Sequence, residues 1–162
     1  MIITTSDIVD ATHYCAREIN NSEWKPDVVI GVLRGCVYFY SSLTPYLKFP
    51  FQMDFITLER YNETLVVKNV PPDLYKKKVL VVEGIVDTGN TIRAIYDDFT
   101  RTRRCKSVKF VSLLKRKTAK IGKCELIYGQ EIDEGWIFGY GMDDIDGYKR
   151  NLTEIIIKDV NI

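Results

Sequence analysis

Hydrophobic residues along the chain follow two different periods. Short runs rich in valine, isoleucine and leucine alternate with segments whose apolar residues recur every three or four positions. The short runs predict strands at 27–33, 51–59, 77–83 and 107–115, with two late extended segments at 135–143 and 154–160. The helical spacing predicts helices at 6–20, 35–47 and 91–102.

The order of these elements predicts the fold class. Strands alternate with helices through the first two thirds of the chain, and the strands are almost continuously apolar. Such strands are buried on both faces, as in a parallel sheet. We therefore expect an α/β fold, a twisted parallel sheet with helices on both faces, formed by a single domain over 1–162. The segment 59–76, which has mixed polarity and contains Pro71-Pro72, is expected to form a hairpin or a flexible flap.

Composition and charge bear on the size of the core, the partners and the cellular compartment. With 162 residues, 46% of them hydrophobic, the chain is long enough for one sizeable core. Its 23 basic and 22 acidic residues nearly cancel, which argues against nucleic acid or an anionic membrane as the principal partner. Four widely spaced cysteines, without a C-x-x-C pair, a signal peptide or an apolar run of spanning length, predict a cytoplasmic protein with reduced thiols.

The lone histidine excludes two kinds of site. His13 is the only histidine, so a Ser-His-Asp triad and a His-rich zinc site are not expected. It falls within the first predicted helix, where it is interpreted as an ordinary helix residue. Ser6 is the predicted cap of that helix.

Polar residues gather where the third predicted strand ends. Glu83 closes the apolar run, and 87–91, Asp-Thr-Gly-Asn-Thr, precedes the next helix. Ligands bind beyond the carboxyl ends of parallel strands, and amides at a helix start bind phosphate. The carboxylates of Glu83 and Asp87 could meet hydroxyls, a magnesium ion or a proton in transfer. The G-x-x-x-x-G-K-[ST] and G-x-G-x-x-G motifs are absent, and spacing alone fits an ordinary strand-to-helix turn equally well.

Three fragments resemble one enzyme family. VLVVEGIVDTGNTI (79–92) resembles the phosphoribosyl pyrophosphate (PRPP) motif of type I phosphoribosyltransferases. IGVLRGCVYFY (30–40) is similar to the pyrophosphate loop of the hypoxanthine-guanine enzymes, and EGWIFGYGMDDIDGYKRNL (134–152) is similar to their purine-side segment. The fragments occur in the family's order, and the resemblance covers most of 27–152.

The resemblance implies a fold and a reaction. The fold would be that of the type I phosphoribosyltransferases, with a small hood from terminal segments, a flap near 59–74 and a purine-side hood segment near 132–152. The reaction would join the ribose of PRPP to hypoxanthine or guanine and release pyrophosphate, in purine salvage. The implied partners are PRPP, a purine base, a nucleoside monophosphate and further copies of the chain, as a homodimer or homotetramer.

The resemblance also implies roles for individual residues. Asp87 would be the general base near the purine N7. The residues implied to bind the ribose and 5-phosphate are Glu83, Thr88, Gly89, Asn90 and Thr91. Those implied to bind pyrophosphate are Leu33, Arg34, Gly35 and Arg150, with a non-proline cis bond in the loop. Those implied to contact the purine are Arg116, Trp136 and Ile137. Mg²⁺ is the implied cofactor, held by Asp143 and Glu83, and the implied flap residues are Arg60 and Tyr61.

The chain departs from the family pattern at several positions. Gly84 replaces an aspartate beside Glu83, a loss that would weaken PRPP or metal binding, alter the acceptor pocket or reduce activity, unless Glu83 and water suffice. Arg60 replaces a serine. Arg116 replaces the purine-contacting lysine, with Lys115 or Lys117 as alternatives if the alignment slips by one residue. One extra residue separates the positions matched to the magnesium carboxylate and to the pyrophosphate arginine.

Two other functions remain open from the sequence. One is transfer to xanthine or another nucleobase. The other is a regulator that keeps the fold and binds nucleotide or RNA with little transfer. The basic residues Arg101, Arg103, Arg104 and Lys106 form either a solvated face or an RNA contact.

Overall fold

A six-stranded sheet forms the centre of the protein. The structure is a computed structural model and describes residues 1–159. The strand order is β4-β3-β2-β5-β6-β7, in which β4 is antiparallel to β3 and the other neighbours are parallel. The strands are β2 (Val28–Val32), β3 (Gln52–Tyr61), β4 (Thr64–Lys68), β5 (Lys78–Val86), β6 (Ser107–Arg116) and β7 (Glu125–Ile132).

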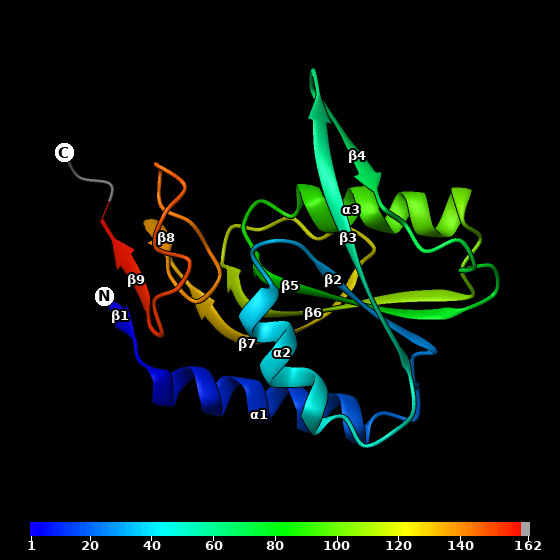
Figure 1. Cartoon of the computed structure of the whole chain (residues 1–162), viewed down its shortest axis with the longest axis horizontal. Coiled ribbons are helices and arrows are strands. Elements are labelled where there is room, and N and C mark those ends of the chain that lie inside the picture. The colour runs from blue at the N-terminus through cyan, green and yellow to red at the C-terminus, as the bar shows by residue number, and fades with distance from the viewer. Residues whose placement is uncertain (160–162) are drawn as a thin grey trace.

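Helices cover both faces of this sheet, as predicted (Figure 1). On one face lie α1 (Thr5–Asn21) and α2 (Val37–Leu43), which continues into a 3₁₀ turn, Thr44–Tyr46. On the other lies α3 (Asn90–Asp97), extended by a π-helical turn, Asp98–Thr102. Within residues 1–159, no helix is both long and apolar enough to cross a bilayer.

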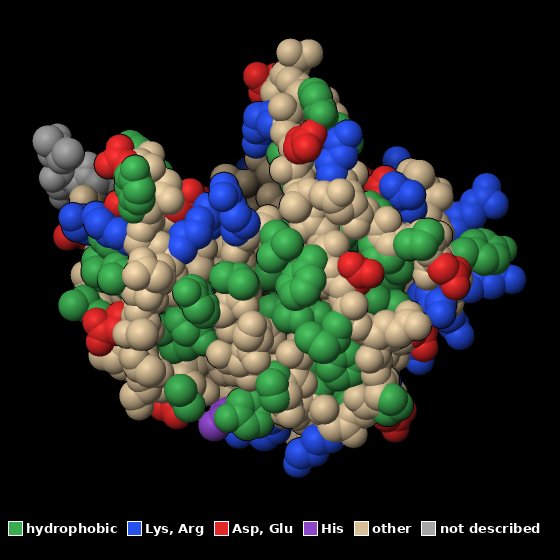
Figure 2. Space-filling model, viewed as in Figure 1, with side chains coloured by type: hydrophobic (Ala, Val, Ile, Leu, Met, Phe, Trp, Pro, Cys, Tyr) green, Lys and Arg blue, Asp and Glu red, His purple; other side chains and the backbone are tan. Residues whose placement is uncertain are grey.

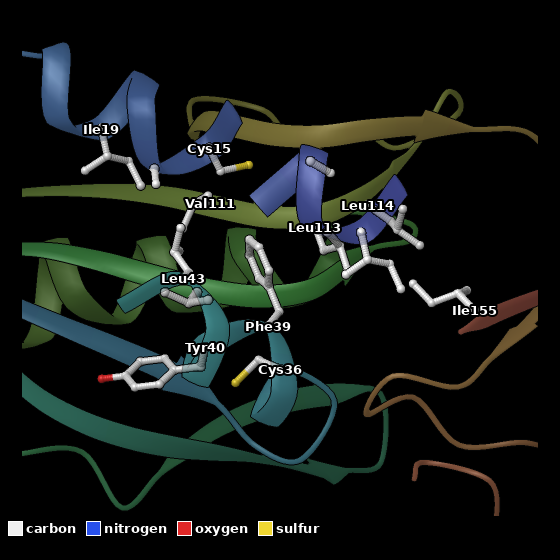
Figure 3. Packing of buried hydrophobic residues seen from close by; sticks show 14 of the residues in the cluster. Cys15, Ile19, Cys36, Phe39, Tyr40, Leu43, Val111, Leu113, Leu114 and Ile155 are labelled. Carbon is white, nitrogen blue, oxygen red and sulfur yellow. The ribbon is translucent and has the colours of Figure 1, made fainter. Parts of the chain in front are cut away.

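The core under α1 and α2 joins segments far apart in sequence (Figure 3). Cys15 and Ile19 from α1 meet Phe39 from α2 and Val111 from β6, and none of these side chains is more than 2% exposed. Burying each of the larger apolar side chains stabilises the fold by about 1.5–3 kcal/mol. The hydroxyl of Tyr40 donates to the carbonyl of Val29 at 2.8 Å, so α2 is fixed to β2 of the central sheet.

The core under α3 confirms the predicted helical period. Ile92, Ile95 and Phe99 are at most 1% exposed and pack on the face of the sheet that carries Val81 and Phe110. This packing fixes the amino end of α3 at the carboxyl end of β5. The residues between β5 and α3 therefore lie where a parallel sheet binds ligands.

A small second sheet forms the hood from the two terminal regions. Its strands are β1 (Ile2–Ile3), β9 (Ile155–Lys158) and β8 (Trp136–Phe138), in that antiparallel order. Figure 1 shows it at the left, beyond one end of the central sheet. Ile155 is fully buried in the core under α1, so the hood is anchored to the main body.

A hairpin projects from the top of the body in the view of Figure 1. Strands β3 and β4 are joined through Asn62 and Glu63, with Asn62 at φ 54°. The tip stands clear of the sheet in Figure 1. The structure thus forms a hairpin in the segment 59–76, and its movement as a flap stays a prediction.

Some predicted boundaries are wrong. The cap of α1 is Thr4 rather than Ser6, because Thr4 and Asp7 exchange hydrogen bonds in a capping box and the helix starts one residue before Ser6. Only 136–138 of the extended segment 135–143 is a strand. The predicted strand 154–160 is shorter, because β9 covers Ile155–Lys158, and its last residue lies outside the described residues.

Candidate active site

A cavity of about 550 Å³ opens between the carboxyl ends of β5 and β6 and the hood. Figure 2 shows a hollow between the hood and the β3–β4 hairpin, bordered by Lys and Arg side chains. The cavity is lined by residues from several segments in which the sequence predicted site residues, together with apolar and acidic neighbours. The lining residues are Arg34, Gly35, Ile85, Asp87, Arg116, Trp136, Ile137, Met142, Asp143, Asp144, Ile145 and Arg150.

The loop after β2 forms one wall of this cavity. The Leu33–Arg34 peptide bond is cis, which confirms the expectation from the family resemblance. Leu33 donates its N–H to the carbonyl of Ile56 at 2.9 Å, and Val37 donates to the carbonyl of Arg34 at 3.1 Å. The backbone is therefore tied at both ends, while the Arg34 side chain is exposed and Gly35 borders the cavity.

The turn between β5 and α3 is built around Gly89. This residue has φ 92°, and a Cβ added to it would lie 2.1 Å from the carbonyl oxygen of Lys120. The same segment donates the N–H of Lys120 to the carbonyl of Thr88 at 3.0 Å, which closes the turn. Exposed Thr88 and Asn90 and half-buried Thr91 surround the amino end of α3, where free amides favour an anion.

Asp87 and Arg116 meet across the sheet at one edge of the cavity. The Arg116 Nε donates to Asp87 Oδ1, and the two side chains are 10% and 60% exposed, respectively. The same guanidinium donates from Nη1 to the carbonyl of Asp133 at 2.8 Å and from Nη2 to that of Gly135 at 2.7 Å. A single arginine thus links the ends of β5 and β6 to the turn before β8.

The geometry distinguishes the three candidates for the purine-side cation. Lys115 pairs with Glu131 at 2.8 Å and exposed Lys117 pairs with the carboxylate of Asp133 at 2.7 Å. Neither lysine lines the cavity, whereas Arg116 does. Of the three residues, Arg116 is therefore the one placed to meet a ligand in the cavity, and its contact with a purine stays a prediction.

The hood contributes an aromatic wall. Trp136 begins β8, pairs with Lys158 of β9 and leaves its side chain 48% exposed at the cavity. Ile137 follows it, opposite Ile157 in the register. An accessible indole beside a polar cavity suits the stacking of a planar ligand, because every base has a π face.

Asp143 and Arg150 form an ion pair at the far edge. Their Oδ2 and Nη2 atoms are 2.8 Å apart, and Arg150 Nη1 donates to the carbonyl of Gly141 at 2.7 Å. The extra residue in the spacing therefore does not remove Arg150 from the cavity. The intervening loop accommodates it.

The sequence reasoning missed Asp144, which organises that loop. Its carboxylate accepts from the Lys149 ammonium at 2.9 Å and from the Tyr148 backbone N–H at 2.8 Å. The hydrogen bond from Lys149 is the main cause of a lowered pKa for the Asp144 carboxyl. The Asp-x-Asp-Gly pattern at 144–147 is typical of a turn and was the available signal.

Glu83 differs from the other acids because it is buried. It is 9% exposed, and burial raises the pKa of its carboxyl to about 8, although a backbone hydrogen bond from Gly84 opposes this. Within the described part of the chain, the residues that line the cavity do not include Glu83. Its predicted contact with ribose or metal stays a prediction.

Gly84 has a steric role that the sequence did not reveal. A Cβ added to it would lie 2.7 Å from the carbonyl oxygen and 3.1 Å from the carbonyl carbon of Gly35. The backbone of the loop after β2 thus occupies the space that the family's aspartate would need. Gly84 and the position of this loop are coupled.

The donor set fits a magnesium ion in one place. Mg²⁺ commonly takes one or two carboxylates together with phosphate oxygens and water. Asp143 borders the cavity, its side chain is 43% exposed, and it meets this requirement. Among residues 1–159 no three His, Cys, Asp or Glu side chains cluster as a protein-only metal site. Buried Glu83 suits direct coordination less well.

The predicted flap residues lie away from this cavity. Arg60 and Tyr61 end β3 at the tip of the hairpin. Tyr61 is 52% exposed and donates its hydroxyl to Glu59 Oε2 at 2.5 Å. The structure does not bring these residues into the lining, and their role stays a prediction.

The strand order, the hood and the cavity at the sheet's carboxyl edge together define a type I phosphoribosyltransferase fold. A family model described as phosphoribosyl transferase domain matches residues 4–145. The chain belongs to this family.

Known relatives agree in sequence and structure. The chain is 29% identical over 153 residues to a hypoxanthine-guanine phosphoribosyltransferase of Mycoplasma genitalium, covering 90% of this chain and 85% of that one. It resembles the crystal structure of a Bacillus anthracis hypoxanthine-guanine phosphoribosyltransferase with a TM-score of 0.85 at 29% identity, covering 96% of this chain and 95% of that one. For a Trypanosoma cruzi hypoxanthine phosphoribosyltransferase in complex with its product IMP, the TM-score is 0.84 at 28% identity, with 98% and 92% covered.

Proposed function

We propose that this protein transfers the phosphoribosyl group of PRPP to a 6-oxopurine, hypoxanthine or guanine, and releases pyrophosphate, in purine salvage. The observation that carries the proposal is the convergence of the 34–35 loop, Asp87, Trp136 and Asp143 on one cavity, from separate segments of the chain. The cavity volume of about 550 Å³ is in the usual range for small-ligand sites. The relatives reported above carry the corresponding enzyme name.

The positions of the candidate site residues suggest how the substrates would lie. The backbone amides of 88–91, which lie outside the cavity lining, would bind the 5-phosphate once the Asn90 amide leaves its 3.2 Å hydrogen bond to Thr88 Oγ1. The exposed Arg34 with the backbone of Gly35 would bind the pyrophosphate. The purine would stack on Trp136, a contact worth about 1–3 kcal/mol. In this arrangement the reacting carbon of the ribose would lie between the base and its leaving group.

Catalysis would then depend on positioning and charge. The transition state for such a transfer resembles an oxocarbenium ion, so a fixed alignment of base and ribose contributes most. Asp87 would accept a proton from the purine N7 side as the new bond forms. Magnesium, when bound at Asp143, would neutralise charge on the pyrophosphate, and Arg150 would assist through its own charge.

A flap would protect the reaction from water. A phosphoribosyl cation is captured by water when exposed, so closure of a segment over the site is expected. The projecting β3–β4 hairpin, with Arg60 and Tyr61 at its tip, is the candidate segment. Arg60 in place of the family's serine implies different contacts on closure.

We further propose a cytoplasmic homo-oligomer, a dimer or a tetramer. All four cysteines are unpaired thiols, as expected in a reducing compartment. Four apolar residues on α2, the 3₁₀ turn after it and β3 are each at least 37% exposed and would suit a contact between subunits: Val37, Tyr38, Tyr46 and Met53.

A regulator with little transfer activity is the second candidate. The observation that favours it is Gly84, because the family's acid is missing and Glu83 is buried. Retention of Asp87, Trp136 and Asp143 in the cavity favours the enzyme.

A panel assay tests the proposal. PRPP and magnesium are supplied with hypoxanthine, guanine, xanthine, adenine, uracil or orotate, and pyrophosphate release is followed. The proposal predicts the highest kcat/KM with hypoxanthine or guanine. Intact nucleotide binding without turnover on any base would support the regulator instead, and a preference for xanthine would reassign the acceptor.

A further inference from the structure

Arg116 has more partners than a purine contact requires. A guanidinium has five N–H donors, and three hydrogen bonds join this one to Asp87, Asp133 and Gly135. The residue is 8% exposed, although it ends a strand at the cavity. Its charge is therefore largely committed to other parts of the protein before any ligand binds.

The partners of Arg116 belong to two different parts of the site. Asp87 directly follows β5 and is the proposed base that acts on the purine. The carbonyls of Asp133 and Gly135 belong to the turn that leads directly into Trp136. The guanidinium thus bridges the acid and the stacking platform.

The turn before Trp136 is also restrained by contacts other than those with Arg116. Gly135 has φ 136°, and a Cβ added to it would lie 2.7 Å from Ile157 Cγ2 and 2.9 Å from the carbonyl oxygen of Lys158. The backbone of Lys117 donates to the carbonyl of Ile132 at 3.0 Å, so the strand ends on either side are also tied. The turn is held against β9 on one side and by Arg116 on the other.

We propose that Arg116 is a positioning residue that fixes Asp87 and the Trp136 platform relative to each other, and so sets the gap that receives the purine. The proposal rests on the proposed function. A planar fork with donors at three corners can satisfy a carboxylate and two carbonyls at once, whereas a lysine ammonium is a point charge on a flexible stem. Arg116→Lys, which installs the family's residue, should therefore weaken purine binding.

The test combines kinetics with a reporter that needs no ligand. The chain has two tryptophans, and Trp24 lies at the opposite end of β6, where it donates to Ser107 Oγ at 2.8 Å. A Trp24→Phe background leaves Trp136 as the only indole. Acrylamide quenching of the ligand-free protein then reports how firmly the platform is held.

Arg116→Lys in this background should increase the quenching of Trp136. It should also raise KM for the purine by roughly tenfold to a hundredfold, the effect of losing a charge-assisted hydrogen bond, and leave KM for PRPP within about twofold. Lys109→Met is the matched control, because this lysine of the same strand pairs with Glu125 at 2.9 Å at the distant end. It should change neither quantity.

The outcomes distinguish a positioning role of Arg116 from a direct purine contact alone and from a role in folding. A raised purine KM with unchanged quenching would make Arg116 a direct contact only and would overturn the proposal, as would no change in either. If the lysine variant does not fold, Arg116→Met is measured in the same way. Failure of both to fold would place Arg116 in the fold rather than in the site and would also reject the proposal. If the parent turns over no base, the proposed function fails, and the quenching alone still tests whether Arg116 holds Trp136 in place.

Discussion

Replacement of Gly84 by alanine probes the contact between β5 and the loop after β2, which is proposed to bind pyrophosphate. The added Cβ would lie 2.7 Å from the carbonyl oxygen of Gly35, closer than Cβ contacts occur in proteins. The backbone of Gly141 approaches the same oxygen from the hood side, since a Cβ built on Gly141 would lie 2.6 Å from it, so the oxygen has little room to move. Gly84→Ala should therefore displace the loop or strain the strand.

The size of the effect follows from two opposing contributions. Overpacking costs about 1–3 kcal/mol, and alanine is favoured over glycine within a strand by about 0.5–1 kcal/mol. At the midpoints of these ranges the net loss of unfolding free energy is about 1.2 kcal/mol, which lowers Tm by roughly 2–5 °C for a chain of this length. KM for PRPP should rise at the same time, because Arg34 and Gly35 move with the loop.

Thermal unfolding and PRPP titration of Gly84→Ala provide the measurements. Gly35→Ala is the stability control, because a Cβ there would have nothing within 4 Å. Gly84→Asp, which restores the family residue, should be less stable than Gly84→Ala and should not tighten PRPP binding. If Gly84→Ala melts with the parent and binds PRPP equally well, the steric reasoning is wrong.

Three further variants test other parts of the account. Folded Glu83, with its pKa raised from 4.5 to about 8, stays protonated while the unfolded chain ionises, so stability should fall as pH rises from about 4.5 to about 8. Glu83→Gln should flatten that slope in urea unfolding, and an unchanged slope would exclude this cause. Asp87→Asn should lower kcat by about 10²–10⁴ while calorimetry finds product affinity within about tenfold; equal losses in both would contradict a role as base. Gly89→Ala should lower Tm by more than Gly84→Ala does, because its Cβ would be 2.1 Å from a carbonyl oxygen at positive φ, and an unchanged Tm would refute the tight turn.

The elements predicted best were those with a strong hydrophobic period. Val79 to Val82 are an unbroken apolar run and form the buried centre of β5, and Ile92, Ile95 and Phe99 keep helical spacing in the core. Strand β7 was missed because it lies at an edge, where most of its side chains are only half-buried and polar residues interrupt the pattern. The two-residue strand β1 exists only through its pairing with β9, which no local pattern reveals.

The candidate site likewise contains residues that were predicted from the sequence and contacts that were not. The rule that ligands bind at the carboxyl ends of parallel strands placed the 87–91 turn, and the family resemblance supplied Trp136 and Asp143. The Asp87–Arg116 pair was not predictable, because these residues are 29 positions apart and meet only through the register of β5 and β6. The contact between Gly84 and Gly35 likewise depends on tertiary packing.

The most direct test of the central claim is to detect the product itself. Hypoxanthine or guanine is incubated with PRPP, Mg²⁺ and either the parent protein or Asp87→Asn, and nucleoside monophosphate is measured by mass spectrometry. The account predicts one nucleotide for each pyrophosphate released by the parent and a loss of about 10² or more in rate for the variant. Absence of nucleotide from the parent with either base would contradict it, as would equal rates for the two proteins.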